Sequence, residues 1–319
     1  MAQGHIDRLL ALDEVQIVAL ADISDASFEK TVKRQPAVES ALRFFDYRQL
    51  LDTVRPDAVV ICTPHTLHYE QAVGALDAGA HVLLEKPMVC RVVDAKALLA
   101  KIDEAQRVVG LGYQRHAQPQ YRYIHERISS GSVGAVQFVT ALQQQNWLRS
   151  TIGTWRHDPA LSGGGQLNDS GSHLVDVLLW TTGLAPEAVS SFNDNKCSAV
   201  DINTAISVRF VGGAMGTLNI IGDAPGFYED VTIWCERGAF YVRAGQPLKV
   251  QATDGSFSTP DASEMPAGSD VDTNFIRAIQ GKEEIAAPPI CGLRTIEFTE
   301  AAWQSAAVGG AMTTVALNL

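Results

Sequence analysis

The sequence has few cysteines, and they form no pattern that would build a disulfide framework or a zinc site. Their number is odd, they lie far apart, and no two form a C-x-x-C pair. The eight histidines likewise form no H-x₃-H or HExxH cluster. We therefore assign no metal and expect small, free thiols in a reducing, cytoplasmic compartment. The cysteines are Cys62, Cys90, Cys197, Cys235 and Cys291.

Positive charge and long apolar runs are also lacking. Lys and Arg number 25 against 36 Asp and Glu, so the formal net charge is −11. A net acid repels phosphate backbones, which argues against a nucleic-acid partner. No apolar run reaches the roughly 18 residues that a membrane helix needs, and no secretory leader follows Met1. We expect neither a membrane nor a nucleic acid as partner.

Residues 1–115 alternate between helical and extended patterns. The extended segments are short and apolar on both faces, which is typical of a parallel sheet covered by helices on both sides. These segments are 15–22, 57–63, 81–85 and 108–112. Helical spacing is found at 4–12, 27–33, 47–54, 68–78 (before Gly79) and 92–106. The pattern predicts a doubly wound α/β (Rossmann) domain over 1–115.

From about residue 133 the pattern changes to hairpins. Extended segments follow one another with glycine-rich turns, which predicts an open, mostly antiparallel sheet. They lie at 136–144, 206–211, 215–221, 231–235 and 239–242, and helices are expected at 174–180, 271–280 and 293–308. We therefore predict a second, α+β domain over 116–319. Its open sheet is large enough to serve as the interface of a homodimer or homotetramer.

The front of the first domain differs from the usual dinucleotide-binding pattern. Such domains start with a strand and a glycine-rich turn, followed by a helix whose N-terminus holds the pyrophosphate. Here the helical pattern starts at once, and the acid that ends the next strand is Asp22. The fingerprint places that acid about 20 residues after its last Gly or Ala, which falls at Ala2. We expect the first strand to lie upstream of Met1, leaving a vacant lane between the strands that end at Asp22 and Thr63. The alternative is a domain that begins with a helix and binds no nucleotide.

Two polar motifs follow neighbouring apolar strands, at the edge where open α/β sheets bind ligands. The first, Thr63-Pro-His-Thr-Leu-His68, follows one strand, and Glu85-Lys-Pro87 follows the next. Lys86 at the end of an apolar strand is unusual for a structural lysine, because a desolvated ammonium has a lowered pKa. We therefore consider it for proton handling, although an isolated Glu-Lys-Pro is more often a surface turn.

A third motif runs from Gly163 to Asp176. Asp169 and His173 are four residues apart, and on a helix they would project from one face. A carboxylate beside an imidazole fixes its tautomer and raises its basicity, as a general base requires. The three glycines ahead of the pair could let the backbone approach a ligand. The alternative for the pair is a hydrogen bond on a helix surface, and Asp176 could be structural.

Together these motifs resemble the Gfo/Idh/MocA family of NAD(P)-dependent oxidoreductases. The resemblance also includes Gly112-Tyr-Gln-Arg115, Trp155-Arg-His-Asp-Pro159 and the tail 274–281, so it runs along the whole chain. It implies a catalytic trio of Lys86, Asp169 and His173. It also implies cofactor contacts by Asp22, Ile23, Thr63, Pro64, His65, His68, Glu85, Lys86 and Gln114. Substrate contacts are considered for Arg115, Trp155, Arg156 and His173.

The chemistry that the resemblance implies is hydride transfer between nicotinamide and a hydroxyl carbon of a sugar, inositol or related polyol. His173 would take the hydroxyl proton, Lys86 would polarise the oxygen, and Asp169 would orient His173. The carboxylate of Asp22 favours NAD over NADP because it would repel a 2′-phosphate. Two alternatives remain open. One is an NAD-retaining glycosidase of the same family, and the other is an impaired binding or partner protein that lacks the pyrophosphate-binding turn.

Overall fold

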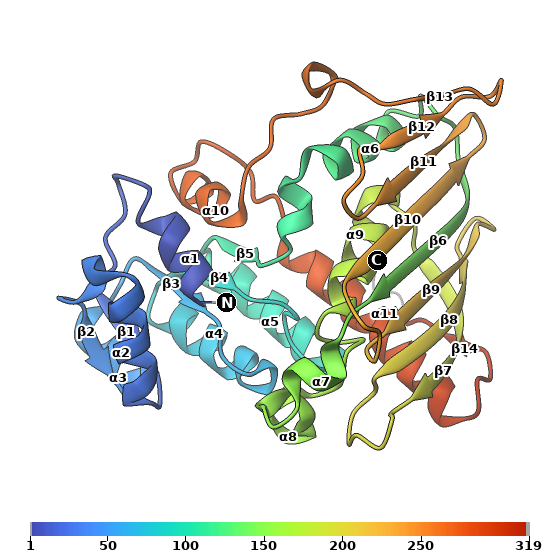
Figure 1. Ribbon diagram of the computed structural model, residues 1–319. Helices are drawn as coiled ribbons and strands as arrows, with labels where there is room; N and C mark the ends of the chain where they lie inside the picture. Colours follow the sequence, from blue (N-terminus) through green and yellow to red (C-terminus); the bar gives the residue numbers. More distant parts are fainter. Residues whose placement is uncertain (1, 317–319) are drawn as a thin grey trace.

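The computed structural model describes residues 2–316 and contains three sheets (Figure 1). Two of them are small and parallel and belong to the first part of the chain. One pairs β1 (Ala19–Ala21) with β2 (Leu42–Phe44), and the other has the order β3 (Ala58–Ile61), β4 (His81–Leu84), β5 (Val109–Leu111). The helices of this part are α1 (Ala2–Leu9), α2 (Asp25–Arg34), α3 (Tyr47–Val54), α4 (His68–Asp77) and α5 (Val92–Ala105). The doubly wound α/β domain is confirmed.

The strands of this domain are apolar on both faces because helices cover both. Val82, Leu83 and Leu84 of β4 are each at most 1% exposed. Helix α4 is followed by Gly79 at a φ of +82°, a conformation that side-chain-bearing residues rarely adopt, so the expected helix-stop glycine is present. Helix and strand boundaries therefore place the carboxyl ends of β3 and β4 beside one another, where the Thr63 and Lys86 motifs begin.

The strands β1 and β3 lie in different sheets and are not paired in the part of the chain that the structure describes. This arrangement agrees with the vacant lane that we expect between these two strands. Helix α1 packs against β3 and against α10 (Val271–Ile279). Its buried face carries His5, Ile6 and Leu9. The first helix thus lies against the sheet that carries the Lys86 motif (Figure 1).

The third sheet has nine strands in the order β13-β12-β11-β10-β6-β9-β8-β7-β14. Neighbouring strands are antiparallel except β6 and β9, which run parallel, so the sheet is mixed and mostly antiparallel. Its strands are β6 (Val136–Gln144), β7 (Pro186–Asp194), β8 (Asn203–Phe210), β9 (Met215–Ile221), β10 (Tyr228–Cys235), β11 (Gly238–Arg243), β12 (Lys249–Gln251), β13 (Phe257–Ser258) and β14 (Thr313–Thr314). The predicted α+β domain with an open sheet is confirmed.

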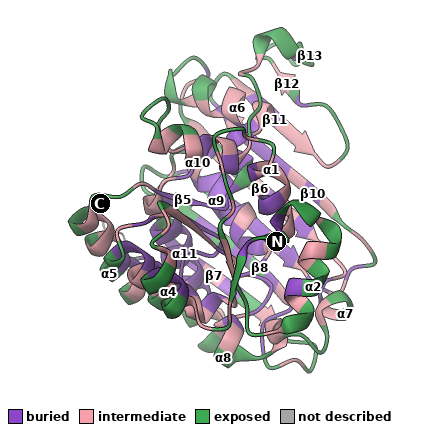
Figure 2. Ribbon diagram, turned by 90° about the vertical axis from the view of Figure 1, so that its left-hand side faces the viewer, coloured by how far each residue is buried: buried purple, intermediate pink, exposed green. Residues whose placement is uncertain are grey.

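One face of this sheet is covered by α9 (Gly171–Thr182) and α11 (Pro289–Ala307), and the other is open (Figure 1). In β8, buried and exposed residues alternate, as a strand with one covered face requires. Helix α9 is buried over most of its length (Figure 2). It packs on the sheet through Leu174, Val175 and Leu178. His173 is therefore held on a rigid, buried element.

Helix α11 joins the two parts of the molecule. Cys291, Leu293 and Ile296 lie in the core of the first domain, whereas Phe298 and Ala302 lie in the core of the second. The predicted border at residue 116 separates the strands of the parallel sheets from those of the large sheet. It does not divide the cores, because the C-terminal helix contributes to both. No helix among residues 2–316 is long and apolar enough to cross a membrane.

Candidate functional site

Lys86 and Asp169, which are 83 positions apart, form a buried pair between the two domains. Lys86 follows β4, and its Nζ donates to Asp169 Oδ1 at 2.8 Å and to the Asp169 carbonyl oxygen at 3.2 Å. Lys86 is 8% exposed and Asp169 is 4% exposed. Attraction within a buried ion pair offsets the cost of desolvating the two groups only when their geometry is excellent, as it is here. The two motifs singled out in the sequence therefore meet at one point.

The carboxylate of Asp169 has two further partners. Oδ2 accepts a hydrogen bond from the indole Nε1 of Trp147 at 2.8 Å and from Nε of Arg156 at 2.8 Å. Burial by itself would raise the pKa of this carboxyl, but the Lys86 ammonium, with help from Arg156, holds it well below its usual range. Asp169 is therefore a fixed anion.

The expected hydrogen bond from Asp169 to His173 is not formed. Helix α9 begins at Gly171, so Asp169 lies in the turn before it, and the i, i+4 spacing does not place the two side chains on one helical face. The acid is the partner of Lys86 instead. This corrects the expectation that Asp169 orients the base.

His173 is half-buried on α9 next to this pair. Its Nδ1 is buried and has no hydrogen-bond partner among residues 2–316. The edge of the Tyr113 ring packs against the imidazole, with centroids 5.9 Å apart and planes at 80°. Burial, then the charges of Lys86 and Arg115, lower the pKa of His173 well below its usual value. The imidazole is therefore neutral at neutral pH and has a free nitrogen.

His65 and Trp155 form a wall beside the pair. Nδ1 of His65 donates to the carbonyl of Ser162 at 3.0 Å, and its Nε2 lies 3.6 Å from Asp169 Oδ1. Burial lowers the pKa of His65 to about 3, so this ring is neutral too. Trp155 meets His65 edge to face at 4.7 Å and carries the Arg156 guanidinium over its ring at 4.4 Å. Three predicted site residues are thus brought together with Asp169.

Asp22 and Ile23 lie at the carboxyl end of β1. One oxygen of Asp22 accepts from the backbone N–H of Ser24 at 2.9 Å, in an exposed turn. Ile23 is 91% exposed, an unusual state for a large apolar side chain. An exposed carboxylate beside an exposed apolar side chain suits a ribose and an adenine ring, so the residues present here fit the adenosine half of a dinucleotide.

The other predicted cofactor residues fall into two groups. Thr63, Pro64 and Gln114 follow the ends of β3 and β5, two strands of one parallel sheet, and Gln114 is exposed. His68, in contrast, is fully buried, and both ring nitrogens face backbone carbonyls, of Pro87 at 2.8 Å and of Thr63 at 3.0 Å. This ring has no nitrogen free for a ligand. It ties the Thr63 turn to the Lys86 turn.

Glu85 is also enclosed by protein. Its Oε1 lies 2.9 Å from His5 Nε2, and His5 Nδ1 lies 2.6 Å from Asp272. Burial would lower the pKa of His5, but its hydrogen bonds, led by the one to Asp272, outweigh burial and raise the pKa to about 11. His5 is a cation between two acids. It fastens α1 and α10 to the end of β4, directly before Lys86.

The three glycines 163–165 allow close packing of the turn before α9. A Cβ on Gly163 would meet Cys90 Sγ at 2.3 Å, and one on Gly164 would meet the Trp303 ring at 2.4 Å. A Cβ on Gly165 would meet the backbone oxygen of Asp201 at 1.9 Å. Gly163 lets the turn before α9 pack against the first domain, and Gly164 and Gly165 let it pack against its own.

Arg115 is buried and held by Glu229 of β10, an acid that sequence reasoning did not single out. Sequence reasoning also missed Trp147, Gln143 and His5. Each reaches the site through the fold, and none belongs to a spaced motif around Lys86 or Asp169. The sequence of β10 gives no signal for Glu229, because Asp230 and Thr232 of the same strand are polar too.

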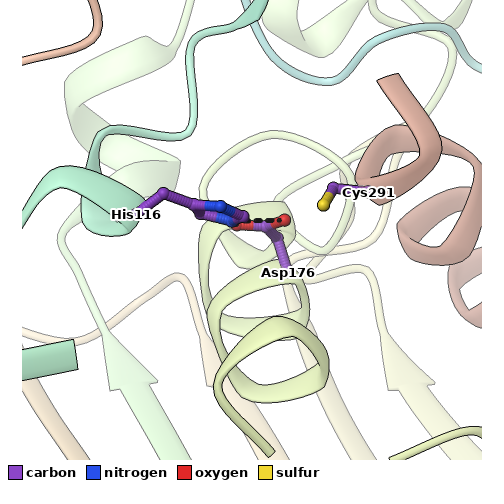
Figure 3. A group of neighbouring side chains, drawn as sticks. All are labelled: His116, Asp176 and Cys291. Carbon is purple, nitrogen blue, oxygen red and sulfur yellow. Dashed lines mark hydrogen bonds and ion pairs between the residues drawn. The ribbon is translucent and has the colours of Figure 1, made fainter. Parts of the chain in front are cut away.

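A separate buried cluster lies between the domains (Figure 3). His116, Asp176 and Cys291 offer ligand atoms within 4.8 Å of one another, although their spacing in the sequence gives no metal motif. His116 Nε2 lies 2.9 Å from Asp176, and its Nδ1 donates to the Ala286 carbonyl at 2.7 Å. The ring and the acid are thus each other's partners. Asp176 joins η3 (Gln114–Ala117) to α9, the structural role considered for it.

Comparisons with known proteins agree with the fold. Residues 1–113 match the family model described as "Oxidoreductase family, NAD-binding Rossmann fold", and residues 121–241 match that of the GFO/IDH/MocA C-terminal domain. Over 99% of this chain and 95% of its own, the structure of levoglucosan dehydrogenase in complex with NADH and levoglucosan is similar, with a TM-score of 0.85 and 19% identity.

Two curated relatives match over shorter stretches. A 4-carboxy-2-hydroxymuconate-6-semialdehyde dehydrogenase of Sphingobium sp. is 31% identical over 42% of each chain. The D-glucoside 3-dehydrogenase of Escherichia coli is 29% identical over 59% of this chain and 52% of its own. The alignments thus span about half the length of these relatives. With both of its domains matched by models of one family, the chain belongs to the Gfo/Idh/MocA family of oxidoreductases.

Proposed function

We propose that this chain is an NAD-dependent dehydrogenase that oxidises a hydroxyl carbon of a sugar, inositol or related polyol, or reduces the matching ketone. The observation that carries the proposal is the buried Lys86–Asp169 pair beside the neutral His173. These groups provide a fixed cation for an oxygen and an uncharged base for its proton. Names of similar proteins, a glucoside dehydrogenase and a levoglucosan dehydrogenase, support the substrate class.

The roles follow from the contacts. The Lys86 ammonium binds the substrate oxygen and stabilises the negative charge that develops on it. The neutral imidazole of His173 takes the hydroxyl proton. Asp169 holds the ammonium in place instead of orienting the base, and Trp155 with Arg156 borders the substrate. A bound NAD would supply the acceptor for the hydride of the same carbon, while Lys86 and His173 act on its hydroxyl.

The cofactor would be held along the carboxyl edge of the parallel strands. The Asp22 carboxylate would accept hydrogen bonds from the ribose hydroxyls, and Ile23 would pack on the adenine. Because neither Ile23 nor Ser24 is basic, nothing in that turn balances a 2′-phosphate, so NAD is favoured over NADP. Thr63, Pro64 and Gln114 are positioned along the same edge for the rest of the molecule.

The test is a turnover screen with the full chain. Sugars, inositols and other polyols are offered with NAD and, separately, with NADP, and reduced cofactor is followed by absorbance. We expect turnover of at least one polyol with NAD and a lower kcat/KM with NADP. Lys86→Met should remove this activity, whereas Lys96→Met, an exposed lysine on α5, should not. Cleavage of a glycoside without net formation of NADH would instead identify the glycosidase alternative.

We further propose that the open sheet face joins copies of this chain into a homodimer or homotetramer. Four aromatic rings follow one another across it, with centroids 5.6–6.3 Å apart. They are Phe138, Trp234, Tyr241 and Phe257. A contiguous apolar stripe on a sheet face marks an interaction surface. The free thiols fit a cytoplasmic location.

A further inference from the structure

Three side chains from different elements converge on one buried acid beside the candidate active site. Glu229 of β10 lies opposite Gln143 in the neighbouring strand β6. Its Oε2 accepts from Nη2 of Arg115 and from Nε2 of Gln143, the latter at 3.0 Å. Its Oε1 accepts from the hydroxyl of Tyr121, of α6 (Pro119–Ser129), at 3.2 Å. Glu229 thus fixes the orientation of both the guanidinium and the amide.

Two polar atoms of this group remain unused. Nη1 of Arg115 and Oε1 of Gln143 are buried and have no hydrogen-bond partner within residues 2–316. The two residues are 8% and 1% exposed. An unsatisfied buried donor or acceptor is costly, and native structures leave few of them. One unused donor and one unused acceptor therefore need an explanation.

The group lies next to His173. Tyr113, two residues before Arg115, packs its ring against the His173 imidazole with centroids 5.9 Å apart. At the start of α9, Ser170 donates to the side chain of Gln145, which follows β6, at 3.0 Å. The end of β6 and the first turn of α9 are thus in contact. Gln143 and His173 are therefore supplied by segments that touch each other, two and three residues from that contact.

Resting on the proposed function, we propose that Arg115 Nη1 and Gln143 Oε1 together bind a second hydroxyl of the substrate, on a carbon other than the one oxidised. A hydroxyl both accepts and donates, so it satisfies both atoms at once. A carboxylate cannot donate to Gln143, and Glu229 already balances the Arg115 charge. The substrate class is therefore a neutral polyol, and Glu229 is a positioning residue that acts through Arg115 and Gln143.

The test compares each polyol with its mono-deoxy analogues and with the matching uronate. Binding to the full chain in the presence of NADH is measured by titration calorimetry, and turnover is measured with NAD. We expect one deoxy analogue to bind the wild-type chain at least about 13-fold more weakly than its parent, because it loses a hydrogen bond to the charged guanidinium as well as a neutral one to the amide. The uronate should bind more weakly than the parent.

Gln143→Leu should weaken binding of the parent polyol by about 2- to 13-fold, the value of one neutral hydrogen bond, and raise KM more than it lowers kcat. It should reduce the preference over the deoxy analogue by the same factor, because Arg115 Nη1 still binds the hydroxyl. Glu229→Gln should also reduce the ratio of parent affinity to deoxy-analogue affinity. Gln137→Leu, an exposed position on the same strand, should leave it unchanged. Should the Leu variant fail to fold, Gln143→Asn withdraws the same oxygen while keeping the amide.

The outcomes separate this inference from the proposed function. A Gln143 variant that keeps the parent-to-deoxy ratio overturns the inference, even if the chain oxidises polyols. Binding of polyols without any NADH formation overturns the proposed function, and the binding ratios still decide the inference. A chain that neither binds nor oxidises any polyol contradicts both.

Discussion

At the residue scale, the site depends on the buried charges of Lys86 and Asp169, each of which needs the other as its partner. Lys86 could be selected from the sequence because an ammonium directly after an apolar strand is costly without a partner. The partner, Asp169, also stood out. Its role did not, because a spacing of four residues implies a shared face only inside a helix, and α9 starts two residues later at Gly171. Trp147 and Glu229 could not be found, since only the fold brings them close.

The first prediction concerns His173 as the base. Replacing His173 with Ala should lower kcat by about 10²–10⁴, the usual contribution of a positioned acid or base. The ring is half-buried, so the fold should persist, and circular dichroism checks this. Near-normal turnover in a folded His173→Ala chain would remove the base from the mechanism.

The protonation of the same ring gives a second prediction. Because burial and the Lys86 ammonium disfavour the imidazolium, the His173 pKa should lie below 6.5 in the wild-type chain. Lys86→Met removes the cation, so the pKa should rise. Proton NMR titration of the imidazole signals, with His173→Ala to assign the resonance, measures both values. A pKa unchanged by the substitution would show that the two groups are not coupled.

At the element scale, pattern and capping predicted most helices and strands. The bounds of β6 and β9 are as expected, and more and less buried residues alternate along both strands. Strand β1 is shorter than its apolar run. Among residues 2–316 it pairs with β2 on one side and with no strand on the other. Helix α6 and strand β7 were missed. The first is rich in polar side chains, and the second mixes Pro, Ser and Asn with its apolar residues, which obscures the period.

A third prediction belongs to the turn before α9. Gly165→Ala would force a Cβ onto the backbone of Asp201, which cannot retreat as a side chain could. Overpacking of this kind costs about 1–3 kcal/mol or more, so Tm should fall by roughly 2–12 °C. Gly226→Ala is the matched control, because its Cβ meets nothing within 4 Å. Equal Tm values for the two variants in thermal unfolding would contradict the packing role.

At the scale of the whole molecule, the two sheet types could be predicted from the change of period near residue 133, and the arrangement of the C-terminal helix could not. Helix α11 carries apolar residues on several faces, which indicates burial but not which cores it enters. In the structure it contributes to both, beside the His116–Asp176 pair, and so holds the domains that supply Lys86 and His173 in one arrangement.

Assembly gives the fourth prediction. The wild-type chain should have the mass of a dimer or tetramer in light scattering, and Trp234→Asp should shift it toward the monomer, because it places a charge within the aromatic stripe. Val93→Asp, at a 61% exposed position on α5, is the control and should not change the mass. A monomeric wild-type chain, or an unchanged Trp234→Asp oligomer, would contradict the interface.

The central claim is that the Lys86–Asp169–His173 site removes a hydride from a hydroxyl carbon. The most direct measurement uses a polyol substrate carrying deuterium on that carbon, with NAD, and mass spectrometry of the reduced cofactor. The account predicts one deuterium in each NADH formed and a slower turnover than with the protonated substrate. NADH without deuterium, or product formed with no reduced cofactor, would contradict it.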